Sequence, residues 1–349
     1  MTGRALLLSP SRGLGGGIER YVGTVESALA ADGVECRRLD LIGSGARAQA
    51  RLLAQARTAL RADPAPTRLI VAHPTLLPAV ALLAREPAAH GMSVLCYGSD
   101  IWGPRWRPRR TLERRLMRRA DVRVVTISGF SAGALMRDCH TALLPPALSR
   151  EWLDTLATAA GARPGRGSVI RLATAFRLSQ WRTKGLPQLV EAVTALGRPD
   201  VRLTICGSGE PPADLLRLVS EHAWCVLRPD LGDDELASEL AAADLFVLAT
   251  QTRKGRGSVG EGFGLVLLEA QAAGTPVIAP AHGGSHEAYV EGVTGMAPTD
   301  ESVEALIRIL QELLKDPGRL AWMGSRAAEW ARQASDPERY AHLAVRRLL

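Results

Sequence analysis

The sequence predicts a doubly wound α/β protein with two domains. Its 349 residues, 46% of them hydrophobic, are enough for two cores, because one domain commonly holds about 150 residues. Short apolar segments alternate with helical patterns, as expected for parallel sheets covered by helices on both faces. The expected strands are residues 5–8, 69–72, 93–97, 122–127, 168–173, 202–206, 245–249 and 276–279.

The domain boundary is expected near the middle of the chain. Residues 161–168, Gly-Ala-Arg-Pro-Gly-Arg-Gly-Ser, have the composition of a linker, and a new strand follows them. We therefore predict Rossmann-like domains at 1–163 and 164–330. Residues 303–315 and 337–349 have helical patterns, and segment 331–349 is expected to form a C-terminal helix that packs back toward the first domain.

Charge and cysteine content restrict the class of protein. The formal net charge is +7, and Lys184, Lys254 and Lys315 are the only lysines among 43 basic residues. An arginine excess of this kind can reflect genome composition, so it identifies no partner. Five cysteines without a C-x-x-C pair fit reduced thiols and no structural metal. No apolar segment resembles a signal peptide or a membrane span, so we expect a soluble or peripheral protein in the cytoplasm.

A glycine-rich turn precedes the predicted helix at 265–273. Gly262 and Gly264 let the backbone approach a ligand, and the first N–H groups of such a helix carry about +0.5 charge, which suits a phosphate. Glu261 and Glu269 are separated by up to roughly 12 Å along the helix axis. One carboxylate can accept hydrogen bonds from a sugar and the other from a ribose. The alternative is an ordinary amphipathic helix with a glycine-rich start.

Three further loops follow predicted strands. Gly16 and Gly17 end a glycine-rich loop that lacks both the G-x-G-x-x-G and the P-loop patterns, so it is either a phosphate contact or a tight turn. Arg177 and Lys184 flank a basic loop in the second domain, suited to a diphosphate or simply solvated. Gly207 lies at the end of a strand, where ligands of α/β proteins bind.

These motifs resemble, in order, those of glycosyltransferase family 4. The matching residues are Arg177, Lys184-Gly185, Gly207-Ser-Gly-Glu210, Ala243-Asp244-Leu-Phe-Val-Leu, Glu261-Gly-Phe-Gly264, Glu269-Ala, Gly274-Thr-Pro-Val and Gly283-Gly284. The loop at 250–260 is similar to that of the phosphatidylinositol mannosyltransferases, and related natural-product glycosyltransferases share the motif order. The resemblance covers nearly the whole chain and is most specific over 169–296.

The resemblance implies a GT-B fold, two Rossmann-like domains facing across a deep cleft, with a nucleotide sugar bound by the second domain and the acceptor by the first. Arg177 and Lys184 would then hold the diphosphate, helped by the amides of Gly16 and Gly17. Glu261 would face the donor sugar and Glu269 the ribose. The remaining donor contacts would come from Gly207, Gly262, Phe263, Gly264 and Leu265, with residues 227–231 beside the base.

The family also implies transfer with retention of anomeric configuration. Positive side chains and helix N–H groups can stabilise the leaving diphosphate, so no metal and no cofactor are expected. The chain contains no Asp-x-Asp sequence of the kind that holds Mg²⁺ or Mn²⁺.

The acceptor side departs from the family pattern. Tyr97 and Ser99 stand where many members have a histidine. Asp100 is a candidate for orienting the acceptor hydroxyl, and Tyr97 and Ser99 for contacting substrate; the alternative is a turn at a strand end. His73 also ends a strand, as a candidate acceptor contact or a structural histidine.

An arginine-rich segment occupies residues 105–123. Its members are Arg105, Arg107, Arg109, Arg110, Arg114, Arg115, Arg118, Arg119 and Arg123, with Trp102 and Trp106 nearby. Three interpretations stay open: an interfacial helix on anionic lipid, a site for a phosphorylated acceptor, and a solvated face. No nucleic-acid-binding motif accompanies the charge, so nucleic acid is not an expected partner.

We therefore expect a retaining, metal-independent glycosyltransferase that moves a hexose-type sugar from a nucleoside-diphosphate sugar to an acceptor hydroxyl. The expected acceptor is a small natural product such as an aminocyclitol, or a lipid-linked or phosphorylated polyol. The alternatives are a GT-B sugar-nucleotide epimerase and a catalytically dead nucleotide-sugar-binding protein. The expected location is the cytoplasm, including the inner face of the membrane.

Overall fold

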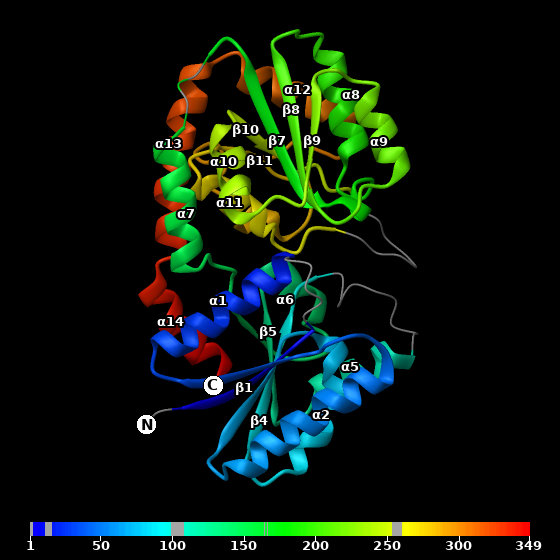
Figure 1. Cartoon of the computed structure of the whole chain (residues 1–349), viewed down its shortest axis with the longest axis vertical. Helices are drawn as coiled ribbons and strands as arrows, with labels where there is room; N and C mark the ends of the chain where they lie inside the picture. Colours follow the sequence, from blue (N-terminus) through cyan, green and yellow to red (C-terminus); the bar gives the residue numbers. More distant parts are fainter. Residues whose placement is uncertain (1–2, 11–15, 99–107, 164, 166, 253–259) are drawn as a thin grey trace. The chain divides into compact units, whose positions relative to one another are not determined.

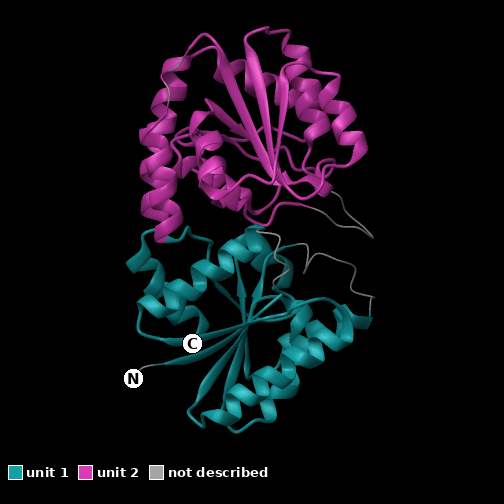
Figure 2. Ribbon diagram, in the orientation of Figure 1, with its two compact units in different colours: residues 1–149, 254–258, 336–349 teal, residues 150–253, 259–335 magenta. Residues whose placement is uncertain are grey.

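The computed structural model describes residues 3–10, 16–98, 108–163, 165, 167–252 and 260–349 (Figure 1). The chain forms two compact units (Figure 2). Unit 1 contains residues 1–149, 254–258 and 336–349, and unit 2 contains residues 150–253 and 259–335. The division follows Ser149, whereas the sequence analysis places it after residue 163. The difference is helix α7 (Arg150–Gly161), which packs on two helices of unit 2.

Unit 1 is built on a parallel sheet of six strands in the order β2-β1-β3-β4-β5-β6. The strands are β1 (Arg4–Ser9), β2 (Glu35–Asp40), β3 (Thr67–Val71), β4 (Ala89–Cys96), β5 (Val122–Thr126) and β6 (Thr141–Leu143). Strand β1 pairs with β2 on one side and with β3 on the other. The order of the strands therefore reverses direction beside β1.

Helices lie on both faces of this sheet. They are α1 (Gly17–Ala31), α2 (Gly45–Ala62), α3 (Leu77–Val80), α5 (Pro108–Met117), α6 (Gly129–Leu135) and α14 (Pro337–Leu348), with short 3₁₀ helices at Pro74–Leu76 and Ala81–Arg85. Side chains of α2, α3, α5 and α6 share one hydrophobic core with β1, β3, β4 and β5. Helix α14 packs on α1, and Ser93 Oγ of β4 donates to the carbonyl of Leu348 at 2.6 Å. The last helix is thereby fastened to unit 1.

Unit 2 has a second parallel sheet, in the order β12-β11-β10-β7-β8-β9. Its strands are β7 (Ile170–Arg177), β8 (Val201–Ser208), β9 (Cys225–Pro229), β10 (Leu245–Val247), β11 (Val277–Ile278) and β12 (Gly295–Met296). Strand β7 pairs with β8 on one side and with β10 on the other. The strand order reverses here, and ligands of doubly wound folds bind at such switch points.

The helices of unit 2 also cover both faces of its sheet (Figure 1). They are α7, α8 (Leu186–Leu196), α9 (Ala213–Ser220), α10 (Asp233–Ala242), α11 (Leu265–Ala272), α12 (Val303–Leu314) and α13 (Pro317–Ala334), with 3₁₀ helices at Leu178–Gln180 and Gly284–Glu287. The core on one face contains residues of α8, α9, α12 and α13 together with residues of the strands. Helix α7 packs on α10 and α11 on the other.

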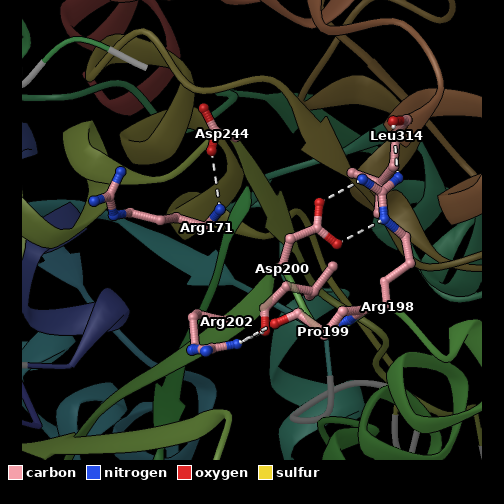
Figure 3. Close-up of polar contacts among 8 residues, drawn as sticks. Arg171, Arg198, Pro199, Asp200, Arg202, Asp244 and Leu314 are labelled. Atoms are coloured by element: carbon pink, nitrogen blue, oxygen red, sulfur yellow. Dashed lines mark hydrogen bonds and ion pairs between the residues drawn. The ribbon is translucent and has the colours of Figure 1, made fainter. Parts of the chain in front are cut away.

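Polar contacts close the amino-terminal edge of the second sheet (Figure 3). Asp244, just before β10, accepts a hydrogen bond from the Arg171 amide at 2.9 Å. Before β8, Arg198 pairs with Asp200 at 2.6 Å and donates to the carbonyl of Leu314 at 3.2 Å. These side chains stabilise the scaffold at the edge opposite to the strand ends where α/β ligands bind.

The structure confirms the doubly wound α/β class and a strand at each expected segment. Strands β2, β6, β9 and β12 are not among the expected segments, and they are the edge strands of the two sheets. Edge strands are covered on fewer sides, and β2, Glu-Cys-Arg-Arg-Leu-Asp, is accordingly polar. Within the described residues, we find no helix that is long and apolar enough to cross a membrane.

Candidate functional site

Unit 2 brings the predicted donor residues to the carboxyl edge of its sheet, at the switch point between β7 and β10. Arg177 is the last residue of β7, and Thr250 follows β10. Since the paired strands are parallel, the loops after them leave the sheet at the same edge. The loops after β7 and β10 therefore lie at the same edge although they are far apart in the sequence.

Gly185 fixes how the basic loop after β7 meets the end of β10. Its φ is +73°, and a Cβ atom there would lie 1.8 Å from the carbonyl oxygen of Ala249. A side chain at this position would therefore be both strained and obstructed. The amide of Gln251 donates to the carbonyl of Thr183 at 3.0 Å, which ties the two loops together beside Lys184.

Lys184 points to Glu261. The Lys184 Nζ lies 2.8 Å from Glu261 Oε2, and Thr250 Oγ1 donates to the same carboxylate oxygen at 3.2 Å. The two charged side chains are only 21% and 12% exposed. Arg182, in the same loop, instead pairs with Asp214 and lies over the Trp181 ring. Of the two cations in this loop, Lys184 rather than Arg182 therefore pairs with Glu261.

The backbone of Glu261 is held by the Gly283-Gly284 pair. The amide of Gly284 donates to the Glu261 carbonyl at 2.8 Å, and Glu261 and Gly283 form an isolated β-bridge. Gly283 has φ of +122°, and a Cβ atom there would lie 2.6 Å from the Glu261 carbonyl oxygen. The sequence analysis includes these glycines only as part of a motif. Their structural role is to fix the turn that carries Glu261.

Helix α11 begins directly after the Glu261 turn. Gly264 is its N-cap, Leu265 is its first residue, and Phe263 is buried beneath the turn. The first amides of the helix therefore lie at the same edge as Lys184, in the arrangement that favours an anion. Farther along α11, Glu269 is only 5% exposed.

Trp152 contacts the predicted site residue Glu269 and is not among the candidates expected from the sequence. Its Nε1 donates to Glu269 Oε1 at 3.1 Å. Trp152 lies in α7, a helix that the sequence analysis assigns to the first domain. In the sequence, the one feature that marks Trp152 is that a large aromatic residue stands in the helix before the predicted linker.

Arg177 and the glycine turn after β8 complete this edge. The Arg177 side chain makes no ion pair or hydrogen bond to the residues that the structure describes. Its strand partner is Ser208, next to Gly207. The carbonyl of Gly207 accepts from the Asp230 amide at 2.8 Å, and Asp230 Oδ1 accepts from the Gly209 amide at 2.7 Å. Residues 227–231 are thereby tied to the glycine turn.

The candidates in unit 1 occupy the ends of its strands and the start of α1. Gly16 is the N-cap of α1, with its amide donating to Glu19 Oε2 at 3.2 Å, and Gly17 is the first helical residue. His73 Nδ1 accepts from the Thr75 amide at 3.2 Å.

Tyr97 belongs to the same region of unit 1. Its ring stacks on that of His73, with 5.9 Å between the centroids, and its hydroxyl donates to the carbonyl of Ala72 at 2.7 Å. The predicted contacts Ser99 and Asp100 lie outside the described residues, so their roles stay predictions.

The arginine-rich segment is extensively paired where the structure describes it. Glu113 lies 2.9 Å from Arg109 and 3.5 Å from Arg110, and Asp138 pairs with both Arg114 and Arg118. Arg119 binds Asp121 at 2.7 Å. Three carboxylates therefore offset part of the charge of five arginines. Residues 99–107, with Trp102, Arg105, Trp106 and Arg107, lie outside the described part.

Two cysteines in unit 2 are unsuited to nucleophilic chemistry. Burial raises the pKa of Cys206 and of Cys225 to about 12. Both thiols are therefore protonated at neutral pH, and a protonated thiol is a poor nucleophile.

Comparison with known proteins supplies independent information. Residues 176–330 match the sequence model of a family described as glycosyl transferases group 1. A GDP-mannose-dependent monoacylated alpha-(1-6)-phosphatidylinositol monomannoside mannosyltransferase of Corynebacterium glutamicum is 41% identical over 156 residues, 42% of this chain and 39% of that protein. A GDP-mannose-dependent alpha-(1-6)-phosphatidylinositol monomannoside mannosyltransferase of Mycobacterium tuberculosis is 30% identical over 264 residues, 71% of this chain and 66% of that protein. The chain thus matches about two fifths and two thirds of these relatives' lengths.

Solved structures extend the likeness to both units. The Anabaena protein HepE, solved in complex with UDP and glucose, superposes with a TM-score of 0.74 at 18% identity, over 99% of this chain and 98% of that one. Sucrose-phosphate synthase of Thermosynechococcus elongatus gives a TM-score of 0.76 at 20% identity, over 97% and 96% of the two chains.

The two parallel six-stranded sheets and these structural neighbours define the class: the protein has the GT-B glycosyltransferase fold. The motif order and the family match then give the family. The chain belongs to the glycosyl transferases of group 1, and the resemblance to glycosyltransferase family 4 is confirmed.

Proposed function

We propose that this protein is a glycosyltransferase that moves a hexose from a nucleoside-diphosphate sugar to an acceptor hydroxyl. The observation that carries the proposal is the carboxyl edge of unit 2, where Lys184 of the loop after β7 pairs with Glu261 of the turn before α11. Residues 176–330, which contain this edge, are the part of the chain that matches the family.

The charges at this edge suit the chemistry of the leaving group. Breaking the bond between the sugar and the diphosphate adds negative charge to the diphosphate oxygens. Lys184, Arg177 and the first amides of α11 are placed to interact with that charge more strongly in the transition state than in the ground state. Because these groups supply the positive charge, we propose that transfer needs no metal ion.

Glu261 has two roles in the proposal. It holds Lys184 through the 2.8 Å ion pair, and its carboxylate would face the donor sugar beside the start of α11. Glu269, four helix residues beyond Leu265, would accept hydrogen bonds from the ribose. Retention of anomeric configuration is proposed from the family resemblance.

The names of the relatives suggest which substrates to test first. The mannosyltransferases depend on GDP-mannose and act on phosphatidylinositol monomannosides, and further relatives are D-inositol 3-phosphate glycosyltransferases. We therefore propose a lipid-linked or phosphorylated polyol as the acceptor and GDP-mannose as the first donor to test. Aminocyclitols and other small natural products form the second acceptor set.

A thermal-shift screen with GDP, UDP, ADP and dTDP tests donor binding. A nucleotide present at a hundred times its Kd stabilises the folded protein by about 2.7 kcal/mol, which is readily measured. The selected nucleotide is then assayed as its sugar derivatives with each acceptor set, and the anomeric configuration of the product is read by NMR. Absence of a shift with every nucleotide would contradict the proposal.

Two rival functions give different products. A sugar-nucleotide epimerase would convert the donor when no acceptor is present, so a donor-only incubation separates it from a transferase. A catalytically inactive transferase would bind the nucleotide but would not turn over the sugar donor with any acceptor. A product with inverted anomeric configuration would be consistent with a transferase but would contradict the proposed retention of configuration.

The arginine-rich surface of α5 supports a proposal about location. Arg115 is exposed and lies beside arginines that outnumber their carboxylate partners. We propose a cytoplasmic enzyme that contacts anionic lipid, or a phosphorylated acceptor, through this surface.

A further inference from the structure

Trp152 and Glu269 form a buried contact inside unit 2. Trp152 is 6% exposed and Glu269 is 5% exposed. The indole Nε1 donates to Glu269 Oε1 at 3.1 Å, which joins α7 to α11.

A carboxylate so well buried needs hydrogen-bond partners. Burial without them costs several kcal/mol, and a bond to an ionised group is about twice as strong as one between neutral groups. An ionised carboxylate has roughly four acceptor positions, and the indole uses one of them. The contact therefore restricts the rotation of the Glu269 side chain.

The indole itself is held by a rigid helix. Leu156, one turn farther along α7, is fully buried, and α7 packs on both α10 and α11. Just after α7, Arg163 Nη2 binds Asp244 Oδ1 at 2.9 Å. The helix that carries Trp152 is thereby held by packing on α10 and α11 and by an ion pair just beyond its last residue.

We propose that Trp152 is a positioning residue for nucleotide recognition: it orients the Glu269 carboxylate toward the hydroxyl groups of the donor ribose. This inference rests on the proposed function, in which Glu269 binds the ribose. Its consequence is specific. Losing the indole N–H should weaken the preference for ribose over deoxyribose, rather than nucleotide binding in general.

The test compares GDP with dGDP, and UDP with dUDP, by isothermal titration calorimetry on the full chain. Two changes remove the N–H: Trp152→Phe, and replacement of Trp152 by benzothienylalanine, which keeps the shape of the bicyclic ring. Glu269→Gln and the double variant complete a mutant cycle. Trp224→Phe is the matched control, because Trp224 is a half-buried tryptophan that packs on the other core of unit 2.

We expect the wild type to prefer the ribonucleotide by about tenfold, equivalent to about 1.4 kcal/mol. Both Trp152 variants should reduce this preference to about threefold or less, Trp224→Phe should keep it, and the double variant should add nothing to Glu269→Gln.

Other outcomes identify which part is wrong. Equal weakening of both nucleotides, with the preference intact and a lower Tm, would reduce Trp152 to a packing residue. If Glu269→Gln abolishes the preference while both Trp152 variants retain it, the positioning role fails and the ribose role of Glu269 stands. If Glu269→Gln retains the preference, the positioning role of Trp152 and the ribose role of Glu269 are both wrong. Failure of the wild type to bind any of the nucleotides would instead contradict the proposed function itself.

Discussion

Replacing Lys184 by methionine removes one charge from the carboxyl edge of unit 2 and keeps most of the length of the side chain. The change has two separable consequences. It leaves Glu261, 12% exposed, without the cation that lies 2.8 Å away, and it removes a cation from the proposed diphosphate site. The first consequence affects stability and the second affects turnover.

The loss of stability follows from the burial of the pair. Removing one partner of a fully buried ion pair costs about 3–5 kcal/mol. Lys184 retains 21% exposure, and Thr250 still donates to the carboxylate at 3.2 Å, so the lower end of that range applies. In a domain of this size, about 3 kcal/mol lowers the Tm by roughly 6–12 °C.

The loss of turnover follows from charge stabilisation in the transition state. Removing one well-placed electrostatic contact costs about 3 kcal/mol. Since each 1.36 kcal/mol is a factor of ten, Lys184→Met should lower kcat/KM by about 150-fold.

A second change separates the two consequences. In the double variant Lys184→Met/Glu261→Gln no buried carboxylate is unpaired, so much of the Tm should return, while kcat/KM stays low. Lys315→Met is the control, because Lys315 is exposed at the end of α12. Differential scanning fluorimetry and steady-state kinetics measure the two quantities. Should Lys184→Met retain kcat/KM within about threefold of the wild type, its proposed charge stabilisation would be refuted.

Four further predictions concern other parts of the chain. Gly185→Ala should lower the Tm more than Gly197→Ala, because both sites have positive φ but only the first has a backbone oxygen, that of Ala249, in the way of a Cβ atom; equal losses would contradict this. Arg198 lowers the pKa of Asp200, so the contribution of Asp200 to stability is present at neutral pH and lost as the pH falls through that lowered pKa. The Tm difference between wild type and Asp200→Asn, measured by calorimetry, should therefore narrow in acid. A difference that stays constant with pH would contradict this prediction. EDTA should leave transfer unchanged; loss of activity that Mg²⁺ or Mn²⁺ restores would show that a metal is needed. Arg115→Glu should weaken flotation with anionic vesicles at low salt, and no flotation of the wild type would end the lipid proposal.

The sequence was sufficient for the fold class and for the proximity of Lys184 and Glu261, whereas the donor roles of these residues stay predictions. Central strands are buried on both faces, so their apolar segments are visible without coordinates. The donor motifs follow those strands, and parallel strands bring their carboxyl ends to one edge whatever the length of chain between them. This is why Lys184 and Glu261, 77 residues apart in the chain, could be expected at the same edge.

Tertiary structure was needed wherever a residue acts through a neighbour that is distant in the chain. The edge strands β2, β6, β9 and β12 form by pairing with a sheet already present, so a polar sequence such as that of β2 gives no signal. The pairing of Arg114 and Arg118 depends on Asp138, which lies outside the arginine-rich segment.

The same reason applies to Trp152. No spacing rule relates a tryptophan in α7 to a glutamate in α11, and the sequence analysis even placed the two in different domains. The sequence by itself determined which strand ends carry the donor candidates, because the apolar strand segments and the glycine turns that follow them are local properties of the chain. Only the packing of α7 on α11 decided what holds the Glu269 carboxylate in place, because that contact joins side chains from two separate helices.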